Sequence, residues 1–396
     1  MKRIGVAEFI LFIFPVTLFA QYADNIEGVQ WRGITVRPLV EALVAHDTRI
    51  GFGEGGETLD DHYTEGSGGL EVYNLPARYR FRIRGLFGYR SYSEFSEQDD
   101  SFYSSQASIS SDETPLIWRV GVDYRKILNL NPYNTDGTIP ERSIETVLID
   151  QSTRRLMLTS NVGYQKRVSE KLTFHPVYEG AHYHEEVVAT NVLTGADDEE
   201  EWQEHHVGAT LRHWYSDKTV LTATAGYRQQ ISDDELGRIL NIEVGAESRL
   251  DYATIWQISI GIAEASYEES GSESAFVFNI RIIREVGGDA TFYVFGGNGY
   301  LPSYRVGSAR LVYQGGYGFE WFFAPRWTLT GQGVHDYQED LNGNTSVLNK
   351  EGRYFITARC RYDFSSKLSG SAAIRFVNDE LAESQTVSML QLNYRY

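Results

Sequence analysis

Apolar and polar residues alternate through most of this chain. In the segment GRYFITARCRYDF (352–364), Tyr354 and Ile356 fall on one face while Arg359 and Arg361 fall on the other. Successive side chains of a β-strand point to opposite faces, so each such segment is predicted to be a strand with one apolar and one polar face.

The sequence closes on the same pattern. The last ten residues, VSMLQLNYRY (387–396), carry one apolar face that consists of Leu390, Leu392, Tyr394 and Tyr396. We therefore expect a terminal strand with an aromatic end rather than a frayed tail.

Repeated alternation bounded by turn residues predicts an all-β chain of about 18 strands, with 16 as the alternative. The expected strands are 31–45, 68–75, 78–90, 102–110, 116–127, 153–165, 171–187, 204–215, 218–231, 238–249, 253–267, 274–285, 290–300, 306–322, 326–337, 352–364, 367–378 and 385–396. An even number is what a closed antiparallel barrel of one bacterial chain requires.

Two kinds of connection alternate between these strands. Tight polar turns are predicted within the segments 164–174 and 212–223. Another is predicted between the segments 352–364 and 367–376. Longer acidic, Gly-rich or Ser-rich segments are predicted to be loops: 93–105, 129–143, 190–202, 266–275 and 337–352. This alternation is typical of an outer-membrane barrel, with short periplasmic turns and longer extracellular loops.

The first residues predict export. MKRIGVAEFILFIFPVTLFA has basic Lys2 and Arg3, an apolar run and a small residue, Ala20, which together resemble a secretory signal peptide over 1–20. The remainder, 21–396, is then one barrel domain. No apolar run of about 18 residues follows residue 30, so a transmembrane helix is not expected.

Composition agrees with a β-protein that does not bind nucleic acid. The chain has 26 Tyr and 37 Gly but nine Pro, and 54 Asp and Glu against 36 Lys and Arg give a formal charge of −18. Phosphate binding needs a basic surface, so nucleic acid is excluded as a partner. The single Cys360 cannot form an internal disulfide and falls on an apolar face.

Lipid explains why the barrel must close. In a bilayer each backbone polar group needs an internal partner, which a sheet provides only when it has no free edge. Aromatic residues gather at strand ends, where interfacial girdles are expected: Tyr164, Trp214, Tyr215, Trp321, Phe322, Trp327, Tyr362 and Phe364. The terminal aromatic strand matches the signal that the bacterial barrel-assembly machinery reads. Outer-membrane lipid and that machinery are the expected partners.

One region resembles a known family. ITVRPLVEALVAHDTRIGFGEGGETLDDHYTEGSGGLEV (34–72) has a Pro-led strand, an HDTRI motif and an acidic loop before a Gly-started strand. It is similar to the start of the β-barrel porin-2 group of bacterial outer-membrane proteins, and the later hairpins extend the similarity to the end of the chain. The resemblance implies an outer-membrane channel.

Charged residues on the polar faces are candidates for the lumen wall. The candidates are Arg80, Arg82, Arg84, Arg359, Arg361, Arg375 and Arg395 as a basic wall, with Glu179, Glu185, Glu243 and Glu247 opposite. Guanidinium groups bind carboxylates and phosphates well. The alternative is that these charges pair with neighbours and only solvate a water-filled interior.

Two other chemistries are less well supported. His182, His184, His205 and His206 lie near the acidic run 197–201, but without a recognised metal-ligand spacing, so neither a metal nor another cofactor is expected. A barrel phospholipase or protease would need a nucleophile beside a positioned base, and no Gly-x-Ser-x-Gly motif occurs. No catalytic residue is assigned.

The sequence therefore predicts an outer-membrane, porin-like channel for passive diffusion of small hydrophilic solutes, and not an enzyme. A channel that secretes polysaccharide would share the barrel and stays open as an alternative. An outer-membrane barrel hydrolase is the less favoured one.

Overall fold

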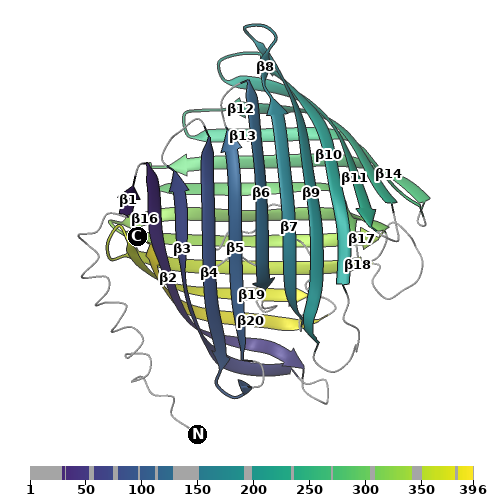
Figure 1. Cartoon of the computed structure of the whole chain (residues 1–396). Coiled ribbons are helices and arrows are strands. Elements are labelled where there is room, and N and C mark those ends of the chain that lie inside the picture. The colour runs from purple at the N-terminus through teal and green to yellow at the C-terminus, as the bar shows by residue number, and fades with distance from the viewer. Residues whose placement is uncertain are drawn as a thin grey trace.

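The computed structural model describes residues 29–31, 33–52, 58–74, 79–96, 99–111, 115–127, 151–190, 199–232, 236–268, 271–303, 308–340, 350–379 and 382–395. Within them, 18 long antiparallel strands join edge to edge into a closed barrel (Figure 1). This confirms the all-β barrel and its strand number. No helix among the described residues is long and apolar enough to cross a membrane. The expected signal peptide 1–20 lies outside the described residues.

Each strand of the barrel pairs with the strand that precedes it in the barrel. The strands are β2 (Ile34–Phe52), β3 (Thr58–Asn74), β4 (Arg80–Tyr92), β5 (Asp100–Ser111), β6 (Leu116–Ile127), β7 (Gln151–Tyr164), β9 (Leu172–Thr190), β10 (Glu199–Trp214), β11 (Thr219–Ser232), β12 (Leu236–Arg249), β13 (Thr254–Tyr267), β14 (Gly271–Val286), β15 (Ala290–Ser303), β16 (Ser308–Ala324), β17 (Trp327–Asp340), β18 (Lys350–Asp363), β19 (Leu368–Asp379) and β20 (Ala382–Arg395). Two short strands, β1 (Val29–Trp31) and β8 (Lys166–Arg167), only extend hairpins with β2 and β9.

The ends of the chain close the barrel. Strand β20 pairs with β19 on one side and with β2 on the other, in a register that runs from Leu39↔Arg395 to Asp47↔Val387. The last strand therefore pairs with the first barrel strand and closes the sheet.

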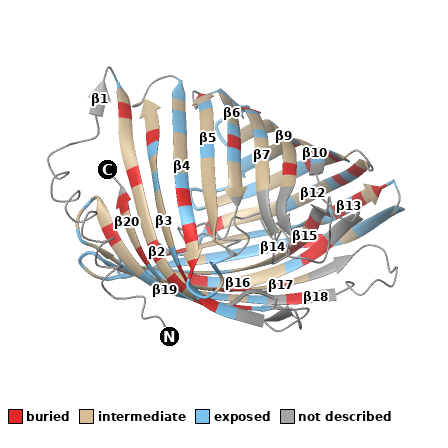
Figure 2. Cartoon of the chain, turned by 60° about the horizontal axis from the view of Figure 1, so that its bottom comes forward, coloured by how far each residue is buried: buried red, intermediate tan, exposed pale blue. Residues whose placement is uncertain are grey.

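The wall is apolar outside and polar inside. On β4, Ile83 and Phe87 point outward and Phe87 is 61% exposed, whereas Arg84 and Arg90 alternate with them on the inner side. Exposed isoleucines of β13 repeat the outer face. In Figure 2 exposed residues recur along strands such as β4, and buried residues gather where β2, β3 and β20 meet. An apolar outer face on a closed sheet belongs in an outer membrane.

An aromatic cluster lies at the short-turn end of β16–β18. Ring centroids of Trp321 and Phe323 are 5.5 Å apart, those of Phe323 and Trp327 are 5.9 Å apart, and those of Trp327 and Tyr362 are 4.7 Å apart. Most of these rings are exposed on the outer surface. The cluster has the position of an interfacial girdle, as the sequence suggested.

The tight turns share a side-chain cap. In SDKT (216–219) and SSKL (365–368) the first serine hydroxyl accepts the backbone N–H of the fourth residue, at 3.1 and 3.0 Å. These local hydrogen bonds stabilise the turn, because the serine hydroxyl pairs with a backbone N–H group that has no partner strand where the chain bends. In the turn after β12, Asp251 accepts the N–H of Ala253, and this bond lowers the pKa of its carboxyl group.

Several strands are longer than the alternation predicted. The acidic segment between 45 and 68 was expected to be a loop, but β2 continues to Phe52 and β3 begins at Thr58. The expected loops 190–202, 266–275 and 337–352 are likewise shortened by strand at one or both ends, and 129–143 lies outside the described residues. The strands continue to pair beyond the lipid layer. Apolar alternation therefore marks only the part of each strand that lies within the lipid. Outward charged pairs such as Arg154–Glu186, at 3.3 Å, belong to that outer zone.

Deletion of residues 394–396 should prevent normal assembly. The deletion removes the last two pairs of the β2–β20 seam and opens backbone groups to lipid, at several kcal/mol each. We expect the amount of heat-modifiable protein in outer membranes to fall by about tenfold or more, measured on unboiled and boiled gels. The control is Tyr252→Ser, because Tyr252 is 95% exposed in a turn. A truncated protein that reaches the membrane at the normal level would contradict the seam.

Cysteine labelling can show which end of the barrel faces the outside of the cell. In a Cys360→Ser background, Glu268→Cys lies at the loop end of the barrel and Asp217→Cys at the turn end, and both side chains are exposed. A large polyethylene-glycol maleimide added to intact cells should label Glu268→Cys and leave Asp217→Cys unlabelled until the outer membrane is broken. The reverse result would invert the topology.

Candidate functional site: the barrel lumen

The interior of the barrel holds two adjoining hollows. A large hollow of about 1080 Å³ is lined mainly by β10–β17, and a small hollow of about 420 Å³ by β4–β11. Both are lined by His206 and Arg228, which lie where the two meet. The lumen is therefore an open space with polar and apolar groups in its lining, rather than a filled core.

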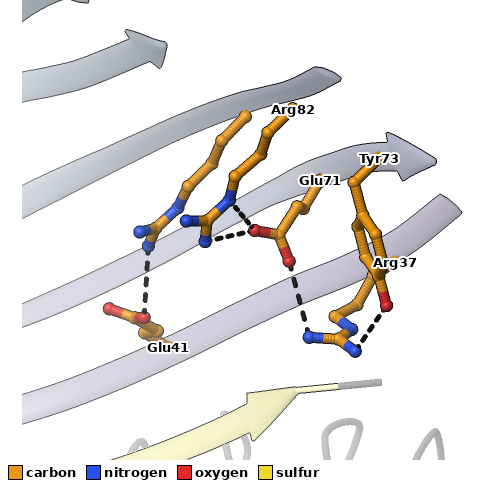
Figure 3. A network of polar contacts seen from close by, with 6 residues as sticks. Arg37, Glu41, Glu71, Tyr73 and Arg82 are labelled. Atoms are coloured by element: carbon orange, nitrogen blue, oxygen red, sulfur yellow. Dashed lines mark hydrogen bonds and ion pairs between the residues drawn. The ribbon is translucent and has the colours of Figure 1, made fainter. Parts of the chain in front are cut away.

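A network of polar contacts covers the inner side of β2–β4 (Figure 3). Glu71 is buried and accepts from Arg82 while it also forms an ion pair with Arg37, at 3.5 Å between Nη1 and Oε2. Arg37 donates in turn to the Tyr73 hydroxyl at 2.7 Å. Arg84 lies 4.0 Å from the Glu41 carboxylate. Each of these three arginines thus has a carboxylate beside it.

The three consecutive arginines of β4 share one face of the strand. Arg82 and Arg84 line the small hollow, and Arg80 follows the same inner periodicity. Glu41 and Glu71 on the neighbouring strands lie beside these arginines, so both signs of charge are present on this side of the lumen. Sequence reasoning missed the two glutamates because the predicted loop left the register of the first hairpin unknown.

The arginines of β18–β20 are spread along the wall instead of level with those of β4. Arg375 is buried and lies opposite Val387, which lies opposite Asp47 of β2. Arg84 lies opposite Glu71, and Glu71 opposite Arg37, ten residues before Asp47. At about 3.3 Å per residue the two points are about 33 Å apart along β2.

The remaining arginines of this group differ in surroundings. Arg361 forms an ion pair with Asp363 of its own strand, at 2.7 Å. Arg359 lies on the same face of β18, opposite Thr330 and Ala373. Arg395 lies opposite Leu39 in the seam, and its side chain is outside the described part of the structure.

The predicted acids face inward but are held by polar partners. Glu179 accepts from Asn161 at 2.9 Å and lies 3.2 Å from His206. Glu243 accepts from Ser259 at 2.8 Å.

The other two acids each lie beside an arginine. Glu247 accepts from Gln257 at 3.2 Å and lies 3.6 Å from Arg212. Glu185 forms an ion pair with Arg155 at 2.6 Å.

Three arginines that sequence analysis did not single out line the large hollow beside these acids: Arg212, Arg228 and Arg281. The side of the lumen expected to be acidic therefore carries both signs. The same alternation that marked Glu243 and Glu247 would have found them, since each is on the polar face of its strand.

A buried cluster lies on the inner side of β2–β4 near their outer end. Arg90 is buried, forms an ion pair with Glu65 at 2.8 Å, and lies over the Tyr63 ring at 4.6 Å. Asp61 accepts the backbone N–H groups of Glu94 and Phe95, at 2.9 and 3.2 Å. The start of the β4–β5 connection is thereby folded inward, and Phe95 packs on the apolar members of the cluster.

The outer part of the β15–β16 hairpin also leans into the lumen. The β14–β15 ladder stops at Asn279↔Gly297, and the Asn298 amide bonds the Phe276 carbonyl and the Phe278 N–H, both at 2.8 Å. Beyond this point Tyr300 packs with buried residues from the inner faces of β12–β14, such as Ala265. Asn298, Tyr300 and Val312 of this hairpin form part of the lining of the large hollow.

The four histidines do not share one site. His206 is on the lumen side, next to Glu179, whereas His205 follows the outward face of β10 and bonds the Tyr178 hydroxyl at 3.0 Å. His182, on β9, pairs with Glu201 at 3.4 Å. Among the described residues no group of three metal-ligating side chains converges. Cys360 is half-buried and lies on the apolar, outward face as expected.

No protein-family model and no curated protein sequence matches the chain. Solved structures do match its fold. OccK9 (OpdG) of Pseudomonas aeruginosa is 10% identical with a TM-score of 0.51, and the match covers 91% of this chain and 98% of that one. A BenF-like porin from Pseudomonas fluorescens Pf-5 is 9% identical with a TM-score of 0.51, covering 92% and 98%. The fold of this chain is that of an outer-membrane β-barrel porin.

Proposed function

We propose that the protein is an outer-membrane channel through which small hydrophilic solutes diffuse passively. The observation that carries the proposal is the hollow of about 1080 Å³, with polar and charged side chains in its lining, inside a closed barrel with an apolar outer face. Its lining offers donors and acceptors such as Gln257, Asn279 and Arg281. A solute that loses water there can exchange its hydrogen bonds with the wall. The shared fold with a porin supports the same proposal.

Pairing of the wall charges sets the expected selectivity. Arg82 and Arg37 share Glu71, and Arg212 lies beside Glu247, so much of the fixed charge is compensated locally. Paired charges produce a short-range field that salt screens further. The channel is therefore expected to pass both signs of ion with weak preference, although the chain carries a formal charge of −18.

Removal of the β4 arginines should make the channel prefer cations. The triple variant Arg80→Ser, Arg82→Ser, Arg84→Ser leaves Glu41 and Glu71 without their ion-pair partners on β4. One unpaired charge about 10 Å from the ion path contributes about 0.4 kcal/mol in water, or about a twofold change in relative permeability. Reversal potentials in planar bilayers under a salt gradient should shift toward cations by at least this factor.

The matched control also removes three cations, but from an exposed turn: Lys166→Ser, Arg167→Ser, Lys171→Ser. It should leave the reversal potential close to that of the unaltered protein. Equal shifts in both triple variants would show that the β4 arginines do not act on the ion path. Absence of any conductance in the unaltered protein would contradict the channel itself.

A further inference from the structure

Two aromatic rings form a patch on one side of the large hollow. Tyr293 and Phe295 both line it from β15, with ring centroids 6.4 Å apart and ring planes inclined by 26°. They are neighbours on the same face of one strand, so the rings lie side by side along the wall. We call this pair the aromatic platform.

Glycines on β16 let the rings lie against the wall. Gly318 is opposite Tyr293 and Gly316 is opposite Phe295. A Cβ atom on Gly318 would fall 2.3 Å from Tyr293 Cζ, and one on Gly316 would fall 2.8 Å from Phe295 Cζ. Any larger residue would push the rings away from the sheet. Both side chains line the hollow and are half-buried, so part of each ring is open to the lumen.

Polar side chains on the neighbouring strands occupy positions beside the aromatic platform. The Tyr293 hydroxyl donates to Gln332 Oε1 at 3.2 Å, and Gln332 is opposite Gly318 on β17. Arg281 is opposite Phe295 on β14, and Asn279 and Gln314 flank Gly297 on either side. All of these side chains line the same hollow. Donors and acceptors therefore border a pair of flat apolar faces.

The lining of the large hollow carries both signs of charge and therefore does not favour a strongly charged solute. Its lining includes three arginines and two glutamates, and Arg212 and Glu247 lie 3.6 Å apart. A neutral solute with many hydroxyl groups fits this lining better than an ion of either sign, because each charged group can still donate to or accept from a hydroxyl.

We propose that the aromatic platform binds a neutral saccharide ring, which stacks on Tyr293 and Phe295 while Gln332, Asn279 and Arg281 bond its hydroxyl groups. This inference rests on the proposed channel and names its solute class. A pyranose has a flat face of C–H groups that suits an aromatic face, and a hydroxyl rim that suits the amides. An open-chain polyol has the same hydroxyl groups but no rigid face to stack.

The test compares a ring with an open chain. Maltose should reduce the potassium chloride current through single channels in a saturable way, whereas sorbitol at equal concentration should reduce it only in proportion to viscosity. The double variant Tyr293→Leu, Phe295→Leu should weaken the apparent maltose affinity by about tenfold or more, since it removes two stacking faces but keeps apolar cover over the glycines.

The matched control is Tyr317→Leu. The Tyr317 ring covers Gly333 in the same way, but it is on the outward face of the same sheet and 58% exposed. Its replacement should leave the maltose effect unchanged. Should the double variant fail to assemble, Tyr293→Leu and Phe295→Leu are compared singly, each with an expected weakening of about threefold or more. Equal effects of sorbitol and maltose, or an unchanged affinity in the variants, would overturn the proposal.

Calorimetric titration of the folded, detergent-solubilised protein with maltose separates this inference from the channel. Maltose binding that is lost in the double variant, in a protein without conductance, would support the aromatic platform and refute the channel. Normal conductance without maltose binding or maltose block would refute the aromatic platform and leave the channel standing.

Discussion

The structure depends on one constraint, which is that no backbone N–H or C=O group can stay unpaired in lipid. The 18 strands meet it because β20 pairs with β2 over Leu39↔Arg395 to Asp47↔Val387, so that the sheet has no edge within the membrane. Side-chain alternation then follows from the pleat. Apolar residues such as Phe87 face lipid, and the polar set is left to line the interior.

Inside the barrel, the same closure brings charges from neighbouring strands together. Arg82 and Arg37 meet at Glu71, and Arg90 meets Glu65 in a buried site at the outer end. A buried charge is tolerated only when it is paired and hydrogen-bonded, and these contacts provide both. Much of the charge on the wall is thus paired locally around the two hollows.

Much of the fold could be predicted from the sequence because a period of two is a strong signal where lipid lies on one side. Strand β6 has the bounds that alternation gave, and the turns at Ser216 and Ser365 were visible as polar interruptions. Strand ends beyond the lipid were not predicted, because polar and acidic residues pair there without apolar alternation. Strand β10, for example, begins at Glu199, and β17 continues to Asp340.

The candidate site was less predictable, because it depends on which residues face each other across strands. Alternation assigns Arg84 to the inner face but cannot reveal that Glu71 is its neighbour, since that requires the register of the first hairpin. The inward lean of the β15–β16 hairpin was also invisible. It follows from a ladder that stops at Asn279↔Gly297 and from the Asn298 amide, which takes the place of the missing backbone pairs.

The most direct test of the account is a disulfide across the seam. Val44 and Leu390 are opposite each other, and paired antiparallel residues have Cα atoms about 4.5–5.5 Å apart, within the range of a disulfide. In a Cys360→Ser background, Val44→Cys with Leu390→Cys should crosslink in outer membranes under mild oxidation and change the migration of the boiled protein. Val40→Cys with Leu390→Cys, four residues out of register, should not. A crosslink in the second pair and none in the first would contradict the register, and no crosslink in either pair would contradict the closed barrel.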